Sequence, residues 1–274
     1  MSNSVLTNSS ALMALQNLNR TNERLTDVQS RINTGLKVQG AKDNASIWAI
    51  AQNQRADMGA LEAVKTSLNR ATSIADVSLA AGESISDLLI DLKKLATAAS
   101  DPSATPESRQ AYDDEFQALL GSVTSFAQNA TFDGENILDG TFTTDLDFLA
   151  NADATDPITM SRQDFTLAGL SLTGLDLQDA TNAAAALNAV SQAITTASGR
   201  LAELGAQAKQ IENHTVFVSR LADALETGIG NLVDADMAKE SARLQALQVQ
   251  QQLGAQALSI ANQAPQIILS LFRN

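Results

Sequence analysis

The sequence predicts a mainly helical fold: a long antiparallel helical bundle or coiled coil, built from the N- and C-terminal halves, with a small central β-hairpin region. Apolar residues recur every three or four positions in both halves, which is the spacing of one helix face. Between about residues 130 and 178 this periodicity is lost and Asp-Gly turns appear. The chain of 274 residues is 44% apolar but only 4% aromatic. This composition suits helical seams of Leu, Ile and Ala better than a thick globular core.

The first helix is expected to end at Gly35. Leu15, Leu18, Leu25 and Ile32 are spaced so that they share one helix face. Glycine commonly supplies the left-handed residue that closes a helix, so Gly35 marks the C-terminus. Because an isolated helix of this kind is only marginally stable in water, we expect it to need a partner.

A much longer helix is expected next. Asp43 or Asn44 can cap its N-terminus, and the apolar spacing continues to about Ser100. Pro102 prevents the helix from continuing. Pro106 suits the first position of a shorter third helix, because proline lacks an N–H that this position does not need.

The middle of the chain shows a different pattern. The dipeptides 133–134 and 139–140 are both Asp-Gly, which favours tight turns between short strands, and residues 165–172 alternate like a strand. We therefore expect a β-hairpin region around residues 130–178. From Thr181 the helical spacing returns, and it is expected to end at Gly228 to Gly230, which would act as a hinge.

The last stretch, residues 232–272, has two apolar faces. One face contains Leu253, Ile260, Ile267 and Leu271, and the other contains Leu244, Leu247, Leu258, Ile268 and Phe272. One partner helix cannot cover both faces, so we expect this end to pack inside an assembly of several copies. Together with Leu15, Leu18, Leu25 and Ile32, these side chains are the candidate self-assembly residues.

The two ends are expected to form one domain, residues 1–42 with 232–274, and residues 43–231 a second. The net charge is −13. Residues 1–40 hold four basic and two acidic side chains and residues 232–274 hold three of each, so the middle carries −15. Nearly neutral ends suit burial, whereas an acidic middle suits a solvated surface that repels nucleic acid and anionic membranes.

The sequence offers few groups for catalysis or metal binding. It has no cysteine and a single histidine, His214, which lies in a helical register and favours a helix-surface or interface role. We therefore expect no catalytic residues, no metal and no cofactor, and we do not expect an enzyme. The N-terminus lacks the pattern of a cleaved secretory signal, so the protein is expected to be cytoplasmic or exported by another route.

Five motifs resemble those of bacterial flagellins. They are Arg31-Ile-Asn-Thr-Gly-Leu-Lys-Val, Ala41-Lys-Asp-Asn-Ala, Phe132-Asp-Gly-Glu-Asn-Ile-Leu-Asp-Gly, Asp234-Ala-Asp-Met-Ala-Lys-Glu-Ser-Ala and Ala255-Gln-Ala-Leu-Ser-Ile-Ala-Asn-Gln-Ala-Pro-Gln-Ile-Ile-Leu-Ser-Leu. They occur in order and cover both ends and the middle. The short middle is similar to that of compact alphaproteobacterial flagellins, which lack large outer domains.

This resemblance implies the structural subunit of an extracellular motility filament. It implies an inner-core domain made by the two termini, export by the flagellar type III machinery with a chaperone, and assembly into a hollow helical tube. The implied partners are copies of the chain itself, the filament cap and hook-associated proteins, with no nucleic acid and no membrane.

One position departs from the flagellins that the vertebrate Toll-like receptor detects. The helix segment matching residues 89–96 carries an arginine in those flagellins, whereas this chain has Asp91. The reversed charge makes Asp91 a candidate for evasion of the receptor. A solvated helix residue is the alternative interpretation of the same side chain.

Two alternative functions remain at this point. A hook–filament junction protein shares the terminal seams, but it would cap filaments instead of extending them. A secreted membrane-active protein would use amphipathic helices, although the terminal faces here are rich in Gln and Asn rather than Lys and Arg.

Overall fold

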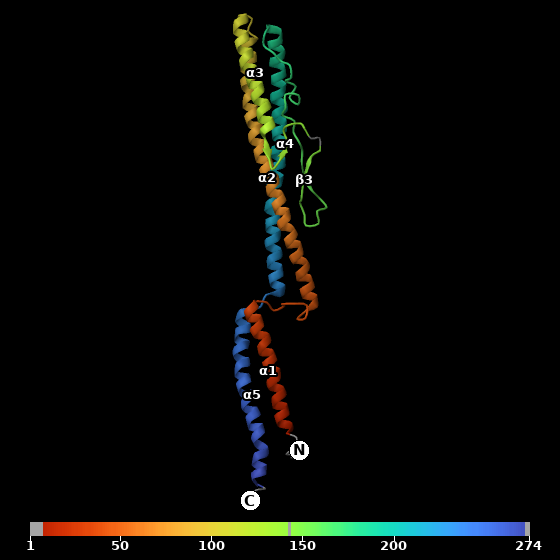
Figure 1. Cartoon of the computed structure of the whole chain (residues 1–274), viewed down its shortest axis with the longest axis vertical. Helices are drawn as coiled ribbons and strands as arrows, with labels where there is room; N and C mark the ends of the chain where they lie inside the picture. Colours follow the sequence, from red (N-terminus) through yellow and green to blue (C-terminus); the bar gives the residue numbers. More distant parts are fainter. Residues whose placement is uncertain (1–7, 142–143, 272–274) are drawn as a thin grey trace. The chain divides into compact units, whose positions relative to one another are not determined.

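The computed structural model describes residues 8–141 and 144–271, with the side chains of residues 8–141 and 144–263. The chain divides into two compact units. The terminal unit contains Met1–Ala56 and Leu225–Asn274, and the middle unit contains Asp57–Ala224. The fold is mainly helical, with small two-stranded sheets between its N- and C-terminal helices (Figure 1). The predicted fold class is therefore confirmed.

The terminal unit is built on two helices that pack against each other, α1 (Ser9–Thr34) and α5 (Met237–Leu271) (Figure 1). Val28 of α1 is buried. Gly254 allows close approach, because a Cβ added there would lie only 3.3 Å from Cδ1 of Leu18. Gly35 adopts a left-handed conformation with φ of 72°, and its N–H bonds to the carbonyl of Arg31 at 2.8 Å. The predicted end of the first helix is thus confirmed.

Two connectors meet within the terminal unit. Leu36, after α1, and Asp234, before α5, form an isolated antiparallel β-bridge. The N–H of Lys37 donates to the carbonyl of Val233 at 2.7 Å, and the N–H of Ala235 donates to the carbonyl of Gly35 at 2.8 Å. These backbone bonds fix the exit of one helix beside the entry of the next.

The predicted helix end at Gly228 to Gly230 is wrong. Helix α4 (Ala180–Val233) continues through both glycines. Each glycine costs a helix about 1 kcal/mol relative to alanine, but Ile229 and Val233 are buried and their packing offsets that cost. The helix ends at Val233. The backbone carbonyl of Val233 accepts hydrogen bonds from the N–H groups of Lys37 and Val38 in the connector after α1.

Helix α2 (Ala45–Ala99) begins and ends close to the predicted positions. Asn44 caps it, because its side-chain oxygen accepts from the N–H of Ile47 at 3.0 Å. Asp43 instead stabilises the connector, accepting from the N–H groups of Gln39 and Gly40. Helix α3 (Pro106–Asn129) begins with proline and is capped by Thr105.

Three helices, α2, α3 and α4, enclose the core of the middle unit (Figure 1). Gly82 of α2 faces Leu201 of α4, and an added Cβ would lie 2.6 Å from Cδ2 of that leucine. The largest fully buried side chains of this core are Leu68, Ile74, Ile85, Leu89, Leu92, Phe116, Ile137, Leu138, Met160, Phe165, Leu172 and Leu177. The apolar spacing of the sequence thus identifies the inward faces of these helices.

The first predicted turn is present. β1 (Thr131–Phe132) pairs antiparallel with β2 (Glu135–Asn136), joined by Asp133 and Gly134. Both loop residues have positive φ, 51° and 81°, as the two-residue hairpin turn favoured by Asp-Gly requires. A second hairpin pairs β3 (Leu146–Phe148) with β4 (Ile158–Met160).

Residues 165–172 form turns and not the predicted strand. The side chain of Asp164 accepts hydrogen bonds from the N–H and the hydroxyl of Thr166 at 2.9 and 2.6 Å. These two bonds form a turn at the start of the segment, where a strand would have to be extended. The N–H of Leu172 then closes back onto the carbonyl of Leu167 at 2.7 Å. Phe165, Leu170 and Leu172 are nevertheless buried. The apolar pattern therefore indicates residues of the core, although they do not form a strand.

Candidate assembly surface

The structure divides the candidate self-assembly residues into two groups. The first group lies between α1 and α5 in the terminal unit, and each of its side chains is half-buried: Leu18, Leu25, Ile32, Leu244, Leu247 and Leu258. These residues contribute to the pairing of the two helices within one chain. The expected second apolar face of the C-terminal helix therefore finds its partner in α1.

The second group remains exposed in the single chain. Leu15 is 42% exposed, Leu253 is 59% exposed and Ile260 is 70% exposed. Four further large apolar side chains of the same two helices are exposed as well: Leu12, Met13, Met237 and Val249. Leaving out Met237, which begins α5, we call the other six residues the exposed terminal strip. Part of it borders a groove of about 450 Å³ between Met13 and Leu253.

The remaining candidates are the last ones in the sequence. The side chains of Ile267, Ile268 and Leu271 are outside the described residues, and so is Phe272 altogether.

Polar contacts that sequence reasoning missed also join α1 to α5. The Nδ2 of Asn8 donates to the carbonyl of Ala261 at 2.7 Å, and the Nε2 of Gln251 donates to Oδ1 of Asn22 at 2.8 Å. The sequence signal was present in the many amides of both helices. Their spacing did not show which of them face the partner helix.

A carboxylate of α5 is buried beside two arginines. The side chain of Glu240 is 7% exposed, and its Oε1 lies 3.1 Å from Nη1 of Arg243 and 3.7 Å from Nη1 of Arg31. A buried charge is tolerated when it is paired. This cluster therefore fixes the start of α5 against the end of α1.

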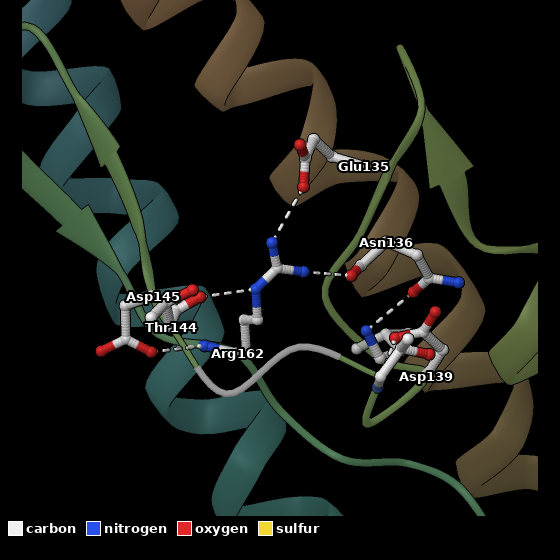
Figure 2. A network of polar contacts seen from close by, with 8 residues as sticks. Glu135, Asn136, Asp139, Thr144, Asp145 and Arg162 are labelled. Atoms are coloured by element: carbon white, nitrogen blue, oxygen red, sulfur yellow. Dashed lines mark hydrogen bonds and ion pairs between the residues drawn. The ribbon is translucent and has the colours of Figure 1, made fainter.

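In the middle unit, Arg162 joins the two β-hairpins (Figure 2). Its guanidinium donates to Glu135 at 2.9 Å, to the carbonyl of Asn136 at 2.5 Å and to the carbonyl of Thr144 at 2.7 Å. Its backbone N–H donates to Asp145 at 3.1 Å. With a side chain only 11% exposed, this arginine acts as a structural link between hairpins.

His214 and Asp91, the two polar residues discussed from the sequence, both occupy ordinary positions on helices. His214 of α4 is half-buried, and its Nε2 lies 2.7 Å from the carbonyl of Ala150. Asp91 is exposed on α2 and forms an ion pair of 2.7 Å with Lys94, one turn further on. The histidine thus anchors a loop, and the aspartate belongs to the solvated face.

In the described part of the chain, no three Asp, Glu, His or Cys side chains gather to hold a metal ion. None of the helices there is apolar over a length sufficient to cross a membrane.

Paired terminal helices that leave apolar side chains exposed are typical of a helical structural protein. Comparison with known proteins gives the family. The model of the bacterial flagellin N-terminal helical region matches residues 5–143, and that of the C-terminal helical region matches residues 187–272. The chain belongs to the bacterial flagellin family. It is a structural subunit of the extracellular flagellar filament and not an enzyme.

Known flagellins from two organisms are similar to this chain over nearly its full length. The chain is 52% identical to flagellin FljM and 50% identical to flagellin FljK of Caulobacter vibrioides, covering 99% of each chain. It is 42% identical to a flagellin of Brucella melitensis over 98% of this chain and 99% of the relative. The predicted resemblance is therefore confirmed.

Two solved structures share the fold. Bacillus cereus flagellin aligns with a TM-score of 0.51 at 23% identity, covering 55% of this chain and 87% of that one. A putative flagellar hook-associated protein from Vibrio parahaemolyticus aligns with a TM-score of 0.58 at 12% identity, covering 70% of this chain and 100% of that one. At these identities the likeness concerns fold alone, and it gives no support to the hook–filament alternative.

Proposed function

We propose that the exposed terminal strip is the surface through which copies of this flagellin pack against one another in the filament. Contiguous exposed apolar surface marks interaction sites in soluble proteins. The observation that carries the proposal is the exposure of Leu253 and Ile260 on α5, whose other face is occupied by α1. Helices with two apolar faces can pair within the chain and still bind a neighbour.

The energetics favour assembly through this strip. Fully burying one Leu or Ile contributes roughly 1.5 to 3 kcal/mol, and each copy offers six large apolar side chains. This burial would add to the pairing of α1 with α5 that each chain already makes by itself.

We further propose the partners that the family suggests beyond self-assembly. The flagellar export machinery and a chaperone would handle the chain before assembly, while the filament cap and hook-associated proteins would contact it at the filament ends. The terminal unit is the expected contact in each case, because it carries the exposed terminal strip. A carrier that covers this strip would keep monomers from polymerising early.

Seeded elongation tests the assembly surface. We expect the double variant Leu253→Gln/Ile260→Gln to elongate filament seeds at least about tenfold more slowly than wild type, since 1.4 kcal/mol corresponds to a factor of ten. Its circular dichroism and thermal unfolding as a monomer should be unchanged, because both side chains are exposed. Filament length by electron microscopy is the measurement.

Leu258→Gln is the matched comparison. Leu258 lies two residues before Ile260 on the same helix but is half-buried, so this variant should weaken the α1–α5 pair in the monomer itself. Wild-type elongation by the Leu253→Gln/Ile260→Gln variant would contradict the proposed surface. Failure of the wild-type protein to extend seeds at all would instead favour a protein that caps filaments.

A further inference from the structure

The only sulfur atoms of this chain belong to its methionines, because the sequence holds five methionines and no cysteine. Four of the methionines lie in the described residues, and their exposure differs. Met160 is fully buried and Met58 is half-buried, whereas Met237 is 43% exposed and Met13 is 64% exposed. Because oxidation of a side-chain sulfur follows its exposure, Met13 is the most vulnerable of these four residues.

Met13 also borders a groove on the exposed terminal strip. It lies on α1 at the groove of about 450 Å³, and α5 contributes Leu253, Gly254 and Ala257 to the same lining. The small residues of this lining leave space beside Leu253 for an apolar side chain of another copy. A methionine at such a groove can adapt to what enters it, because its side chain is unbranched and flexible.

Oxidation changes the chemistry of this position. A methionine sulfoxide is polar, whereas the thioether is apolar. In the free chain, water supplies hydrogen-bond donors to the sulfoxide oxygen. The α5 side of the groove supplies none from its side chains, because Leu253, Gly254 and Ala257 carry no donor there. A sulfoxide at Met13 therefore opposes the loss of water that assembly through the strip requires.

We propose that Met13 is a modification site, at which oxidation by hydrogen peroxide prevents the free chain from entering the filament. The sulfur attacks one oxygen of the peroxide, and the bond between the two oxygens breaks. The attacked oxygen stays on the sulfur as a sulfoxide, and the hydroxide that leaves takes up its proton and becomes water. The thioether is thereby oxidised and the peroxide reduced. This inference rests on the proposed assembly function, since Met13 belongs to the exposed terminal strip.

Oxidation of the monomer before seeding tests the inference. Monomers of wild type, Met13→Leu and Met237→Leu are treated with hydrogen peroxide, freed of it and added to unoxidised seeds. Peptide mass spectrometry measures the sulfoxide at each methionine. We expect wild type and Met237→Leu to elongate about tenfold more slowly after treatment, because burial of an unpaired polar group weakens association. Met13→Leu should keep its rate.

The two variants are matched. Leucine at position 13 is apolar, has a similar volume and cannot be oxidised by peroxide. Met237 is exposed on the same pair of helices but lies outside the exposed terminal strip. Its oxidation therefore controls for effects of peroxide on the terminal unit as a whole.

Two further measurements separate modification of Met13 from damage to the fold. Methionine sulfoxide reductases of both stereospecificities should restore elongation of oxidised wild type, since they return the thioether. In finished filaments the sulfoxide at Met13 should form at least about tenfold more slowly than in monomers, because neighbouring copies cover the side chain.

The outcomes are distinguishable. The inference is overturned if treated Met13→Leu slows as much as wild type, or if wild type keeps its rate with Met13 fully converted. Elongation that the reductases do not restore, or equal oxidation of Met13 in filaments and monomers, would overturn it as well. The slow elongation expected of unoxidised Leu253→Gln/Ile260→Gln would still support the proposed assembly surface in each of these cases. Wild-type elongation by that double variant would instead overturn the surface and this inference together.

Discussion

Asn8 and Ala261 lie 253 residues apart in the sequence and are joined by a hydrogen bond of 2.7 Å. The same asparagine caps α1, since its side-chain oxygen accepts from the N–H of Ala11 at 3.0 Å. The side-chain amide of Asn8 thus makes one hydrogen bond within α1 and one to α5. It satisfies a free donor at the start of α1 and fixes that start beside α5.

Asn8→Ala should therefore loosen both ends at once. Loss of a helix cap costs about 0.5 to 2 kcal/mol, and loss of the bond to α5 costs about 1 kcal/mol more. We expect faster amide exchange in the first turns of α1 and around Ala261 in the monomer, measured by mass spectrometry. The exposed Asn19 is the control, and Asn19→Ala should leave exchange near Ala261 unchanged. Unaltered exchange in α5 of Asn8→Ala would disprove the link.

Arg162→Ala should destabilise the middle unit by roughly 1 to 3 kcal/mol, because the half-buried carboxylate of Glu135 and two backbone carbonyls lose their charged donor. The affected groups are Glu135, Asn136 and Thr144. Urea unfolding followed by circular dichroism measures the change. Arg220→Ala, at an exposed position of α4, should stay within about 0.5 kcal/mol of wild type. A similarly small effect for Arg162→Ala would show that the two hairpins are held by other contacts.

Two glycine-to-alanine changes should act in opposite directions. Gly59 lies within α2 with nothing within 4 Å of an added Cβ, so Gly59→Ala should stabilise by about 1 kcal/mol. At Gly169 the added Cβ would lie 2.5 Å from the carbonyl oxygen of Asp164, so Gly169→Ala should destabilise by about 1 to 3 kcal/mol. Differential scanning calorimetry should show the melting temperature rising in the first variant and falling in the second. The same sign for both would contradict the packing at residues 164–169.

The loop between α2 and α3 contains a perturbed carboxyl group. Hydrogen bonds from the N–H and then the hydroxyl of Ser103 hold the pKa of Asp101 below its ordinary value of 3.8. Since the folded pKa is the lower one, the stabilisation is complete above the unfolded pKa and is lost as the pH falls through the folded pKa. Ser103→Ala should raise the pKa of Asp101 in a ¹³C NMR titration, whereas Ser84→Ala on α2 should not. An unchanged pKa in Ser103→Ala would exclude the hydroxyl as a cause.

Asp91 gives a prediction about recognition by a host. We propose that its negative charge lets the monomer escape the vertebrate Toll-like receptor, since receptor-detected flagellins carry arginine at the matching position. Asp91 is exposed and forms an ion pair with the neighbouring Lys94, so Asp91→Arg should be tolerated and should increase signalling in a receptor reporter assay. Strong signalling by the unmodified monomer would refute this evasion.

The sequence predicted the helices well because their ends carry local chemistry. Gly35 closes α1, Asn44 caps α2 and Pro106 begins α3 as expected. Each of these residues acts on its own backbone or on that of near neighbours, so its effect can be seen without knowledge of the fold. The Asp133-Gly134 turn belongs to the same class.

Predictions from the sequence were wrong where tertiary contacts determine the structure against the local preference of the residues. Gly228 and Gly230 look like a helix end, but the burial of Ile229 keeps the helix intact around them. Residues 165–172 alternate like a strand, but Asp164 bends the chain and no partner strand pairs with them in the described residues. Within the assembly surface, periodicity identified two apolar faces of α5, but only the structure shows which one meets α1.

The bridge between Leu36 and Asp234 also has a mechanical consequence. Because backbone bonds join the two connectors, a force on one connector is shared with the other. The connectors separate only when the bonds from Lys37 and Val38 to Val233 and from Ala235 to Gly35 are broken. A rotating propeller places this kind of load on every one of its subunits, and the paired connectors give each subunit a place that resists it.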